Sequence, residues 1–427
     1  MIKNIFTALL LLLFGPRHIF AQPGDALTLE TVIDLAVRNN PALLSAEQDI
    51  IIAKQRVSEA RFLFLPQLAL SGTLSKVNLQ YPMALGPELG DRYLDADIKE
   101  NFYALRAYAL QPLYNGGRNK NTLSMAKTAH KQAKVNYDTV KMDVVLKAKK
   151  AFYTLLYHRG LAAKARKWHK DAAALDSALK KDGWESIEAK MLVVRLEKQT
   201  QASDKDLEAA GTELIKVLNR EPNYRFEIAG ILEPATVGAD IQKSLVTAME
   251  MRSELKSEIY RAQLDDIAVN MAMVRRSPNI YLGGSYDVIG YKGASLDNSV
   301  RSSNWTASIA IHFPLTYDIW TQIVQKKAEQ RQGDLKRAEV QDKIRFEIIN
   351  ACKELEFRQA ESDKRKNELA AVKLEYEEAF KRGPAGVSTL RAFIAICELE
   401  RDYFDSVYNQ LLARIKLEWA QGRDLAK

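Results

Sequence analysis

The sequence has few residues of the kinds that build disulfides, metal centres or catalytic sites. Its 427 residues include only two cysteines, Cys352 and Cys397, and both fall within helical patterns. We therefore expect core residues rather than a disulfide framework. The five histidines show no metal-ligand spacing, and no zinc, phosphate-loop or nucleophile motif is present. The sequence predicts no enzyme and no bound metal or cofactor.

Long apolar runs are also missing. The longest, Ile5–Phe14, is about ten residues, well below the roughly 18–20 that cross a bilayer as a helix. It follows Lys3 and precedes Gly15-Pro16 and the small residue Ala21, an order typical of a signal peptide. We expect residues 1–21 to be cleaved after export. This excludes an inner-membrane transporter and leaves a periplasmic, outer-membrane or secreted protein.

The charge pattern gives no sign of a nucleic-acid partner. The net charge is +8 at pH 7, but lysines and arginines are mixed with aspartates and glutamates along stretches such as 353–366. That mixture is typical of a solvated helix face. With 47% hydrophobic and 27% charged residues, the chain is expected to fold.

An internal duplication is the most informative feature of the sequence. When the sequence is shifted against itself by about 212 residues, apolar and turn residues coincide without a gap. The coinciding sets are Leu43, Ser45, Val57, Ala60, Pro66, Leu70 and Gly72, and Leu255, Ser257, Val269, Ala272, Pro278, Leu282 and Gly284. Further along, the shift falls to about 202 and then 203. We predict two repeats, 22–220 and 244–427, joined by a connector or equatorial segment, 221–243. Each repeat is expected to run helix, strand, loop, strand, long helix, tip, long helix.

The strands are predicted from period-2 alternation. The apolar positions of one returning strand are Trp305, Ala307, Ile309, Ile311 and Phe313, and the polar positions between them are Asn304, Thr306, Ser308 and His312. In the first repeat Leu68, Leu70, Gly72 and Leu74 share one face. A soluble sheet alternates in the same way, but Trp305 and Phe313 at the ends of the apolar set favour a membrane sheet with an aromatic girdle.

Proline is expected to mark the junctions between helices and strands, because it is tolerated at strand ends and helix starts. Pro66 and Pro278 are predicted where helix changes to strand, and Pro112 and Pro314 where strand changes back to helix.

Two very long helices are predicted, at about 118–180 and 319–380, from apolar or small residues spaced by threes and fours. Each would reach roughly 90 Å. Four strands cannot close a membrane barrel alone, because the smallest barrels have about eight strands and open edges are not tolerated in lipid. The predicted fold class is therefore α+β, with long helical hairpins and four transmembrane strands per chain in a barrel shared by several chains.

Four segments carry a resemblance to a known family: LTLETVIDLAVRNNPAL at 27–43, SEARFLFLPQLALSG at 58–72, LQPLYNGGR at 110–118 and ARIKLEWAQGR at 413–423. They resemble the TolC-like outer-membrane efflux proteins. The resemblance implies a homotrimer with one twelve-stranded barrel in outer-membrane lipid and a helical tunnel in the periplasm. It also implies a periplasmic adaptor (membrane fusion) protein and an inner-membrane transporter as partners, and passive conduction by the duct.

The resemblance assigns adaptor docking to the helix-turn-helix tips, 182–186 and 383–389. The candidate docking residues are Gly183, Trp184, Glu185, Ser186, Gly383, Gly386, Val387, Ser388 and Thr389. Glycine would supply positive φ to end one helix, and serine or threonine would cap the next. An ordinary αα-hairpin turn has the same pattern, and Pro384-Ala385 leaves the register of the second tip open.

The same tips are expected to hold the gate of the tunnel. Many relatives place a carboxylate six residues after the tip glycine, but here both positions are alanine, Ala189 and Ala392. Glu188 and Arg391, one residue earlier, have opposite charges at equivalent places in the duplication. We expect them to pair across neighbouring hairpins and to hold the mouth shut; two solvated helix residues are the alternative.

Two other hypotheses fit the sequence less well. A coiled-coil scaffold or periplasmic adaptor also has long helices, but an adaptor carries one hairpin between all-β modules. A secreted enzyme would need a convergent polar site, and the sequence shows none. The loops 81–100 and 292–303 are expected at the exterior. Drugs, metal ions, polysaccharide and secreted proteins all remain possible cargo.

Overall fold

The computed structural model describes residues 25–79, 98–179, 183–234, 238, 240–292, 299–314, 317–383 and 386–423. Four predicted features lie wholly or partly outside these ranges: the signal peptide (1–21), the middle of each exterior loop (81–97 and 293–298), residues 235–237 and 239 of the connector, and the tip residues Asp182, Pro384 and Ala385. None of the described helices combines the length and the apolar character needed to cross a lipid bilayer.

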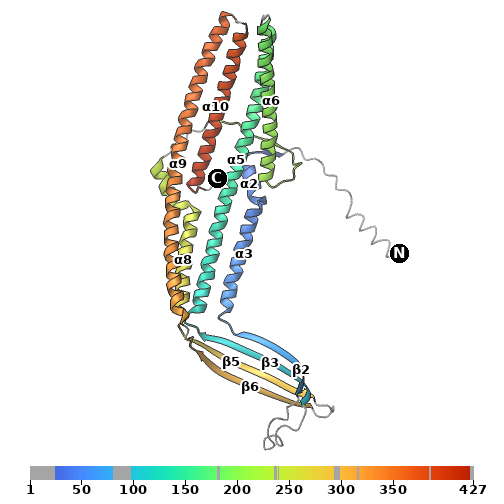
Figure 1. Cartoon of the computed structure of the whole chain (residues 1–427), viewed down its shortest axis with the longest axis vertical. Coiled ribbons are helices and arrows are strands. Elements are labelled where there is room, and N and C mark those ends of the chain that lie inside the picture. Colours follow the sequence, from blue (N-terminus) through green and yellow to red (C-terminus); the bar gives the residue numbers. More distant parts are fainter. Residues whose placement is uncertain are drawn as a thin grey trace, which may run out of the picture. The chain divides into compact units, whose positions relative to one another are not determined.

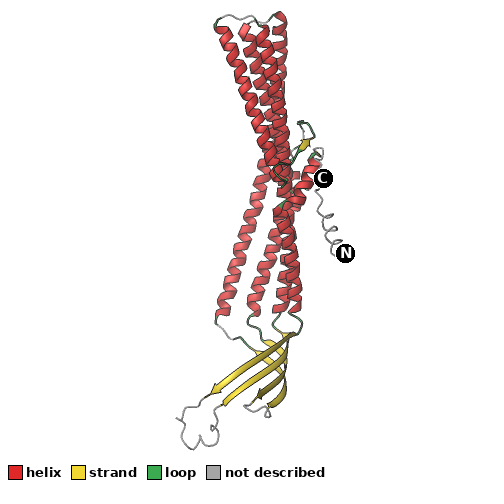
Figure 2. Ribbon diagram, turned by 90° about the vertical axis from the view of Figure 1, so that its right-hand side faces the viewer, coloured by secondary structure: helices red, strands yellow, loops and turns green. Residues whose placement is uncertain are grey.

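The described elements follow the predicted order in both halves of the chain. They are β1 (Asp25–Leu27), α2 (Leu29–Asn39), α3 (Pro41–Phe62), β2 (Gln67–Leu79), β3 (Ile98–Tyr114), α5 (Arg118–Ala178), α6 (Trp184–Val217), β4 (Phe226–Ile228), α7 (Ile241–Met251), α8 (Ser253–Val274), β5 (Asn279–Lys292), β6 (Ser299–His312), α9 (Asp318–Arg382) and α10 (Gly386–Ala420). Helices make up most of the described chain (Figure 2). The two long helices, α5 and α9, agree with the prediction.

The chain divides into two compact units, and each unit draws on both repeats. The helical unit comprises Met1–Leu44, Val140–Met251 and Arg345–Lys427, and the sheet unit comprises Ser45–Thr139 and Arg252–Ile344.

The sheet unit contains a four-stranded antiparallel sheet in the order β2-β3-β5-β6 (Figure 1). Leu70 lies opposite Ala107, Ala107 opposite Tyr286, and Tyr286 opposite Trp305. Because alternate residues of a strand point to the same side, this register puts the apolar positions of all four strands on one face. The predicted facing of the strands is therefore confirmed.

The opposite face of the sheet is mixed: it bears Leu110 and Ile289 as well as the polar contacts. Arg106 of β3 donates to the Asp287 carboxylate of β5, and Asp287 also accepts a hydrogen bond from Ser285 Oγ at 3.0 Å. Ser285 Oγ and Thr306 Oγ1 lie 2.9 Å apart across the β5–β6 pair. The two faces thus differ in chemistry as the alternation predicts.

The four junction prolines behave in two ways. Pro66 and Pro278 directly precede β2 and β5, and Pro314 follows the end of β6 by two residues, as predicted. Pro112 instead lies inside β3, where the pairing with β5 shifts register between Pro112 and Tyr114. The prediction for Pro112 was wrong because a strand tolerates proline at a bulge, where its missing N–H costs no ladder hydrogen bond.

The first helix of each repeat is split in two, which the sequence analysis did not predict. Asn40 is extended (ψ 121°) between α2 and α3, because Pro41 disfavours helical backbone in the residue before it. Asn40 Oδ1 then accepts the backbone N–H of Ala42 at 3.0 Å. In the second repeat Arg252 is similarly extended (ψ 122°) between α7 and α8, and its buried guanidinium lies 3.0 Å from the Glu254 carboxylate.

The core of the helical unit lies where a short parallel strand pair meets the long helices. β1 pairs with β4, with Leu27 opposite Ile228. Leu27, Val32 and Leu214 are fully buried in one cluster with α5 side chains such as Ala148. The segment after α6 is therefore packed against the start of the first repeat.

Candidate functional site

The tips contain two glycines with almost the same backbone conformation. Gly183 (φ +55°) precedes α6, and Gly386 (φ +56°) begins α10 at the equivalent position of the second repeat. Gly383, after α9, has φ +120°. Residues with a side chain rarely adopt a positive φ, which explains why glycine occupies these turns.

The predicted capping by serine and threonine was wrong. The N-cap of α6 is Gly183, which makes no side-chain cap hydrogen bond, and Ser186 lies inside the first turn. Because Gly386 already begins α10, Ser388 and Thr389 also lie within its first turn. Both helices begin earlier than the capping pattern suggested, and at α6 Gly183 fills the cap position itself.

A compact apolar core holds the tip together within the helical unit. One buried cluster is formed by Ala172 of α5 and Leu179 just after it, Ala189 and Leu196 of α6, and Val387, Leu390 and Ile394 of α10. Val387, proposed from sequence as a docking residue, is therefore part of this core and offers no free surface. Its burial stabilises the turn instead.

The two tip helices expose opposite sides at equivalent positions. On α6, Trp184, Ile187, Met191 and Val194 form an exposed stripe, which we call the α6 stripe. Their equivalents on α10 are Val387, Leu390, Ile394 and Cys397, and all four are buried. The contrast is large: Trp184 is 87% exposed and Val387 is 4% exposed.

The small side chains show the reverse pattern. Ala189 of α6 is fully buried against α10, whereas its equivalent on α10, Ala392, is exposed, as is Ala395 three residues later. Helix α10 thus leaves a face of small residues uncovered, and α6 leaves a bulky apolar stripe uncovered.

Glu188 and Arg391 meet at the edge of this core. Arg391 Nε donates to Glu188 Oε1 and Arg391 Nη2 donates to Glu188 Oε2, both at 2.7 Å. This bidentate geometry links α6 to α10, the second helices of the two hairpins. Both side chains are partly exposed, so solvent weakens the pair.

Further polar contacts tie α10 to α5 and α9, and no sequence motif predicts them. Trp168 Nε1 donates to Glu400 Oε2 at 2.7 Å, and Lys373 Nζ donates to Glu400 Oε1 at 2.5 Å. Burial opposes ionisation of Glu400, but the hydrogen bonds from Lys373 and Trp168, with the nearby charges of Lys164 and Lys373, outweigh it and lower the pKa of this carboxyl. Glu400 therefore joins three helices as a carboxylate.

A second contact of this kind lies further along the same helices. Tyr157 Oη donates to Asp405 Oδ1 at 2.5 Å, and its ring stacks on Phe404 and Tyr408. Burial, with the hydrogen bond to Asp405, raises the pKa of the Tyr157 phenol. The phenol is therefore a fixed donor between α5 and α10.

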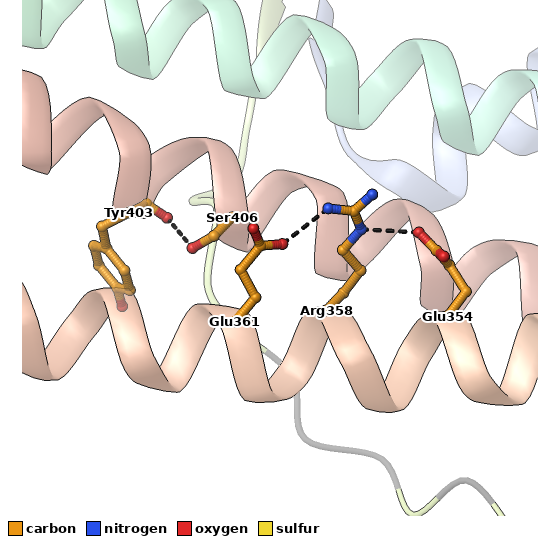
Figure 3. Close-up of polar contacts among 5 residues, drawn as sticks. All are labelled: Glu354, Arg358, Glu361, Tyr403 and Ser406. Atoms are coloured by element: carbon orange, nitrogen blue, oxygen red, sulfur yellow. Dashed lines mark hydrogen bonds and ion pairs between the residues drawn. The ribbon is translucent and has the colours of Figure 1, made fainter.

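Other polar side chains of α9 and α10 form hydrogen bonds within their own helix (Figure 3). Arg358 bridges Glu354 and Glu361, one turn away on either side, at 2.8 Å each, and Ser406 Oγ donates to the Tyr403 carbonyl. The hydrogen bonds that Arg358 donates to Glu361 and Glu354 raise the pKa of its guanidinium. These bonds stabilise single helices and form no convergent catalytic arrangement. Among the described residues, no group of three or more His, Cys, Asp or Glu is placed to hold a metal ion.

Comparison with known proteins agrees with this architecture. Residues 32–180 match the sequence family described as outer membrane efflux protein. No curated protein matches the chain at a significant level.

Several solved structures share the fold over nearly the whole chain. CusC, whose structures concern transmembrane channel formation, aligns with a TM-score of 0.78 and 14% identity, covering 95% of this chain and 96% of CusC. The CmeC outer membrane channel of Campylobacter jejuni has a TM-score of 0.77 and 15% identity, covering 92% and 85%. The outer membrane protein VceC of Vibrio cholerae has a TM-score of 0.77 and 14% identity, covering 92% and 96%.

These matches confirm the predicted resemblance: over residues 32–180 the sequence matches the outer-membrane efflux proteins, and the described chain has the fold of the TolC-like outer-membrane channels.

Proposed function

We propose that this chain is the outer-membrane channel of a tripartite efflux or type I secretion system, in which three copies form one duct. The observation that carries the proposal is the exposed apolar face of the β2-β3-β5-β6 sheet. The most exposed apolar side chains of this face are Leu68, Leu70, Leu74, Trp305, Ile309 and Ile311. Burying such a face in lipid is favourable, whereas leaving it in water is not.

The dimensions of the sheet fit a membrane barrel. Its strands are 13, 17, 14 and 14 residues long, and about 9–11 tilted residues span a bilayer. In the described sheet, β2 and β6 each pair on one side only. A lipid environment requires those edges to pair, so neighbouring copies of the sheet would close the barrel.

The internal duplication indicates how neighbouring copies meet at the tips. Within one chain, the small-residue face of α6 around Ala189 packs on the bulky stripe of α10 around Leu390. If the contact between copies repeats the contact between repeats, the exposed Ala392 and Ala395 face of α10 packs on the α6 stripe of the next copy. This head-to-tail contact joins two different surfaces, and such contacts close into rings when the rotation allows.

A ring of this kind would also alternate the tip charges. Each Glu188 would lie between the Arg391 of its own chain and the Arg391 of the next, since equivalent positions meet equivalent neighbours. We propose that these pairs form the gate at the periplasmic mouth. Both side chains retain exposed area for a second partner.

The partners at the periplasmic end follow the same proposal. A periplasmic adaptor would dock at the turns formed by 183–186 and 383–389, and an inner-membrane transporter would supply the work. The duct itself needs no catalytic group, and the matched family is one of channels rather than enzymes. The repeats are proposed at 22–220 and 244–427, and α7 begins at Ile241, three residues before the second boundary.

Cross-linking between copies tests this assembly directly. In the duplication, Ala395 is equivalent to Leu192 and Met191 to Ile394, and Leu192 and Ile394 share the tip core. Met191→Cys with Ala395→Cys should therefore form a disulfide between copies on mild oxidation, seen as dimers and trimers on non-reducing denaturing gels. Met191→Cys with Lys416→Cys is the control, because Lys416 lies about 30 Å along α10 from Ala395. Equal cross-linking in both variants would refute the proposed contact.

A further inference from the structure

A cavity of about 720 Å³ lies in the sheet unit, where the end of α8 and the strands β5 and β6 meet the starts of α5 and α9. Its ionisable lining residues are Arg118, Arg275, Lys326 and His312, and none of the lining residues is acidic. Amide side chains complete the polar wall: Asn115, Asn279, Gln322 and Gln325. The cavity is therefore a cationic, donor-rich pocket.

Two of the basic side chains keep their full charge for a ligand. Lys326 Nζ lies 2.6 Å from the Glu329 carboxylate, which offsets its charge. Arg275 donates instead to the neutral amide oxygen of Gln322. Within the described part of the chain, neither Arg118 nor Arg275 is ion-paired with a carboxylate. Guanidinium groups that are not neutralised are the preferred donors for carboxylate and phosphate oxygens.

The backbone segments that border the pocket are closely packed. Gly116 has φ +64°, and a Cβ at this position would lie 2.3 Å from the Ser277 Cβ. Only glycine therefore lets the start of α5 approach the end of α8 this closely. Asn119 Nδ2 also donates to the Leu63 carbonyl at 2.6 Å, which fixes the first turn of α5. These contacts place Arg118 and Arg275 on the same cavity.

The two strand residues that line the cavity lie on the polar side of the sheet. Asn279 and His312 are paired residues of β5 and β6 and both line it. By strand alternation they share a face with Ser285 and Thr306, opposite the apolar face that bears Trp305. If the apolar face meets lipid, the cavity lies on the side of the conduit.

We propose that this cavity is an oxyanion site in the wall of the duct, which holds a carboxylate or phosphate group of passing cargo between Arg118 and Arg275. The inference rests on the proposed function, since it takes the polar face of the sheet to line the conduit. It assigns anionic compounds as a cargo class of the channel. A lipid phosphate has the same chemistry, but the polar-face position favours a soluble anion.

Planar-bilayer recordings with pyrophosphate as the probe test the site. In phosphatidylcholine membranes, wild-type channels should prefer anions in a salt gradient, and pyrophosphate should reduce their conductance. Arg118→Gln/Arg275→Gln should weaken the pyrophosphate block about tenfold or more, as expected for loss of charge-assisted hydrogen bonds. The matched control is Lys120→Gln/Arg276→Gln, which removes two exposed charges next to the same positions but outside the cavity lining. Equal block in both variants would overturn the proposal.

Two further arms separate the possible failures. If a lipid headgroup is the occupant, adding phosphatidylglycerol should abolish the pyrophosphate block of wild-type channels, and that result contradicts a cargo site. Calorimetric titration of the detergent-solubilised protein with pyrophosphate measures binding without a channel. Binding that needs Arg118 and Arg275, in a protein that forms no channel, would contradict the proposed function but support the oxyanion site. Absence of binding would contradict the site alone.

Discussion

Glu188 and Arg391 occupy the same position in the two repeats, and their side chains contact each other through two hydrogen bonds of 2.7 Å. A duplicated site has thus acquired opposite charges that join the two hairpins of one chain. In a ring of hairpins, the same alternation of charge would continue from copy to copy.

The first prediction concerns this pair. Glu188→Ala and Arg391→Ala should each raise conductance through the closed channel, because each removes a link between hairpins. The double variant should add little to either single change, with a coupling energy of about 0.2–1 kcal/mol for partly exposed charges. Single-channel recording of the wild type, the two single variants and the double variant measures this coupling energy. Glu197→Ala, on the same helix, serves as the control. If the effects of Glu188→Ala and Arg391→Ala on conductance simply add in the double variant, the pair is not part of the gate.

The second prediction concerns the α6 stripe. Met191→Lys should weaken the trimer, because it would bury an unpaired ammonium in the proposed contact between copies. The temperature at which the trimer separates on semi-native gels should fall for Met191→Lys. It should stay nearly unchanged for Glu197→Lys, which introduces the same residue at an exposed position outside the stripe. An unchanged separation temperature for Met191→Lys would show that the α6 stripe does not form the contact between copies.

The third prediction concerns the two thiols. Burial raises the pKa of Cys397 to about 12, with help from Glu400 and Asp171, and burial also raises the pKa of Cys352. Both thiols should therefore resist maleimide at neutral pH in the folded protein and react after unfolding, since the thiolate is the reactive form. An added exposed thiol, Lys190→Cys, should react at once and calibrates the assay. Rapid labelling of the native wild-type protein would show that the helices around Cys397 open readily.

Prediction from sequence succeeded where one local rule decided the outcome. Strand alternation assigned both faces of the sheet, and Pro66 and Pro278 marked the starts of β2 and β5. The rule that proline marks strand ends failed at Pro112, because a bulge inside β3 accommodates this proline. The bulge depends on the pairing of β3 with β5, which the sequence alone does not show. The split between α2 and α3 was predictable from Asn40-Pro41, since proline restricts the residue before it.

The site was harder to predict because its parts are distant in sequence. The duplication brought Glu188 and Arg391 to notice, but only the packing of α6 on α10 shows that they touch. Trp168, Lys373 and Glu400 carry no motif, and their contact depends on how three helices meet. The basic cavity likewise joins Arg118 to Arg275 through folding alone.

The fourth prediction gives a pH dependence to the helical contacts. The folded-state pKa of Glu400 lies below its ordinary value of 4.5. The unfolded chain therefore binds more protons between these two values, and the stabilisation by Glu400 is present above pH 4.5 and lost as the pH falls through the folded-state pKa. Glu400→Gln should lower thermal stability at neutral pH, and the deficit should shrink in acid.

Thermal melts of the purified protein from pH 7 to pH 3 measure this deficit. The exposed neighbour Glu398→Gln keeps the contacts of Lys373 and Trp168, so it should follow the wild type throughout. A deficit for Glu400→Gln that stays constant with pH would show that the carboxylate charge contributes nothing to these contacts.

The proposed duct requires three copies of this chain. The most direct test is planar-bilayer conductance of the purified protein, with its oligomeric mass measured in the same detergent. Discrete channels of low conductance from a heat-sensitive trimer are the predicted result. A monodisperse monomer that forms no channel would contradict the barrel, the contact between copies and the gate together.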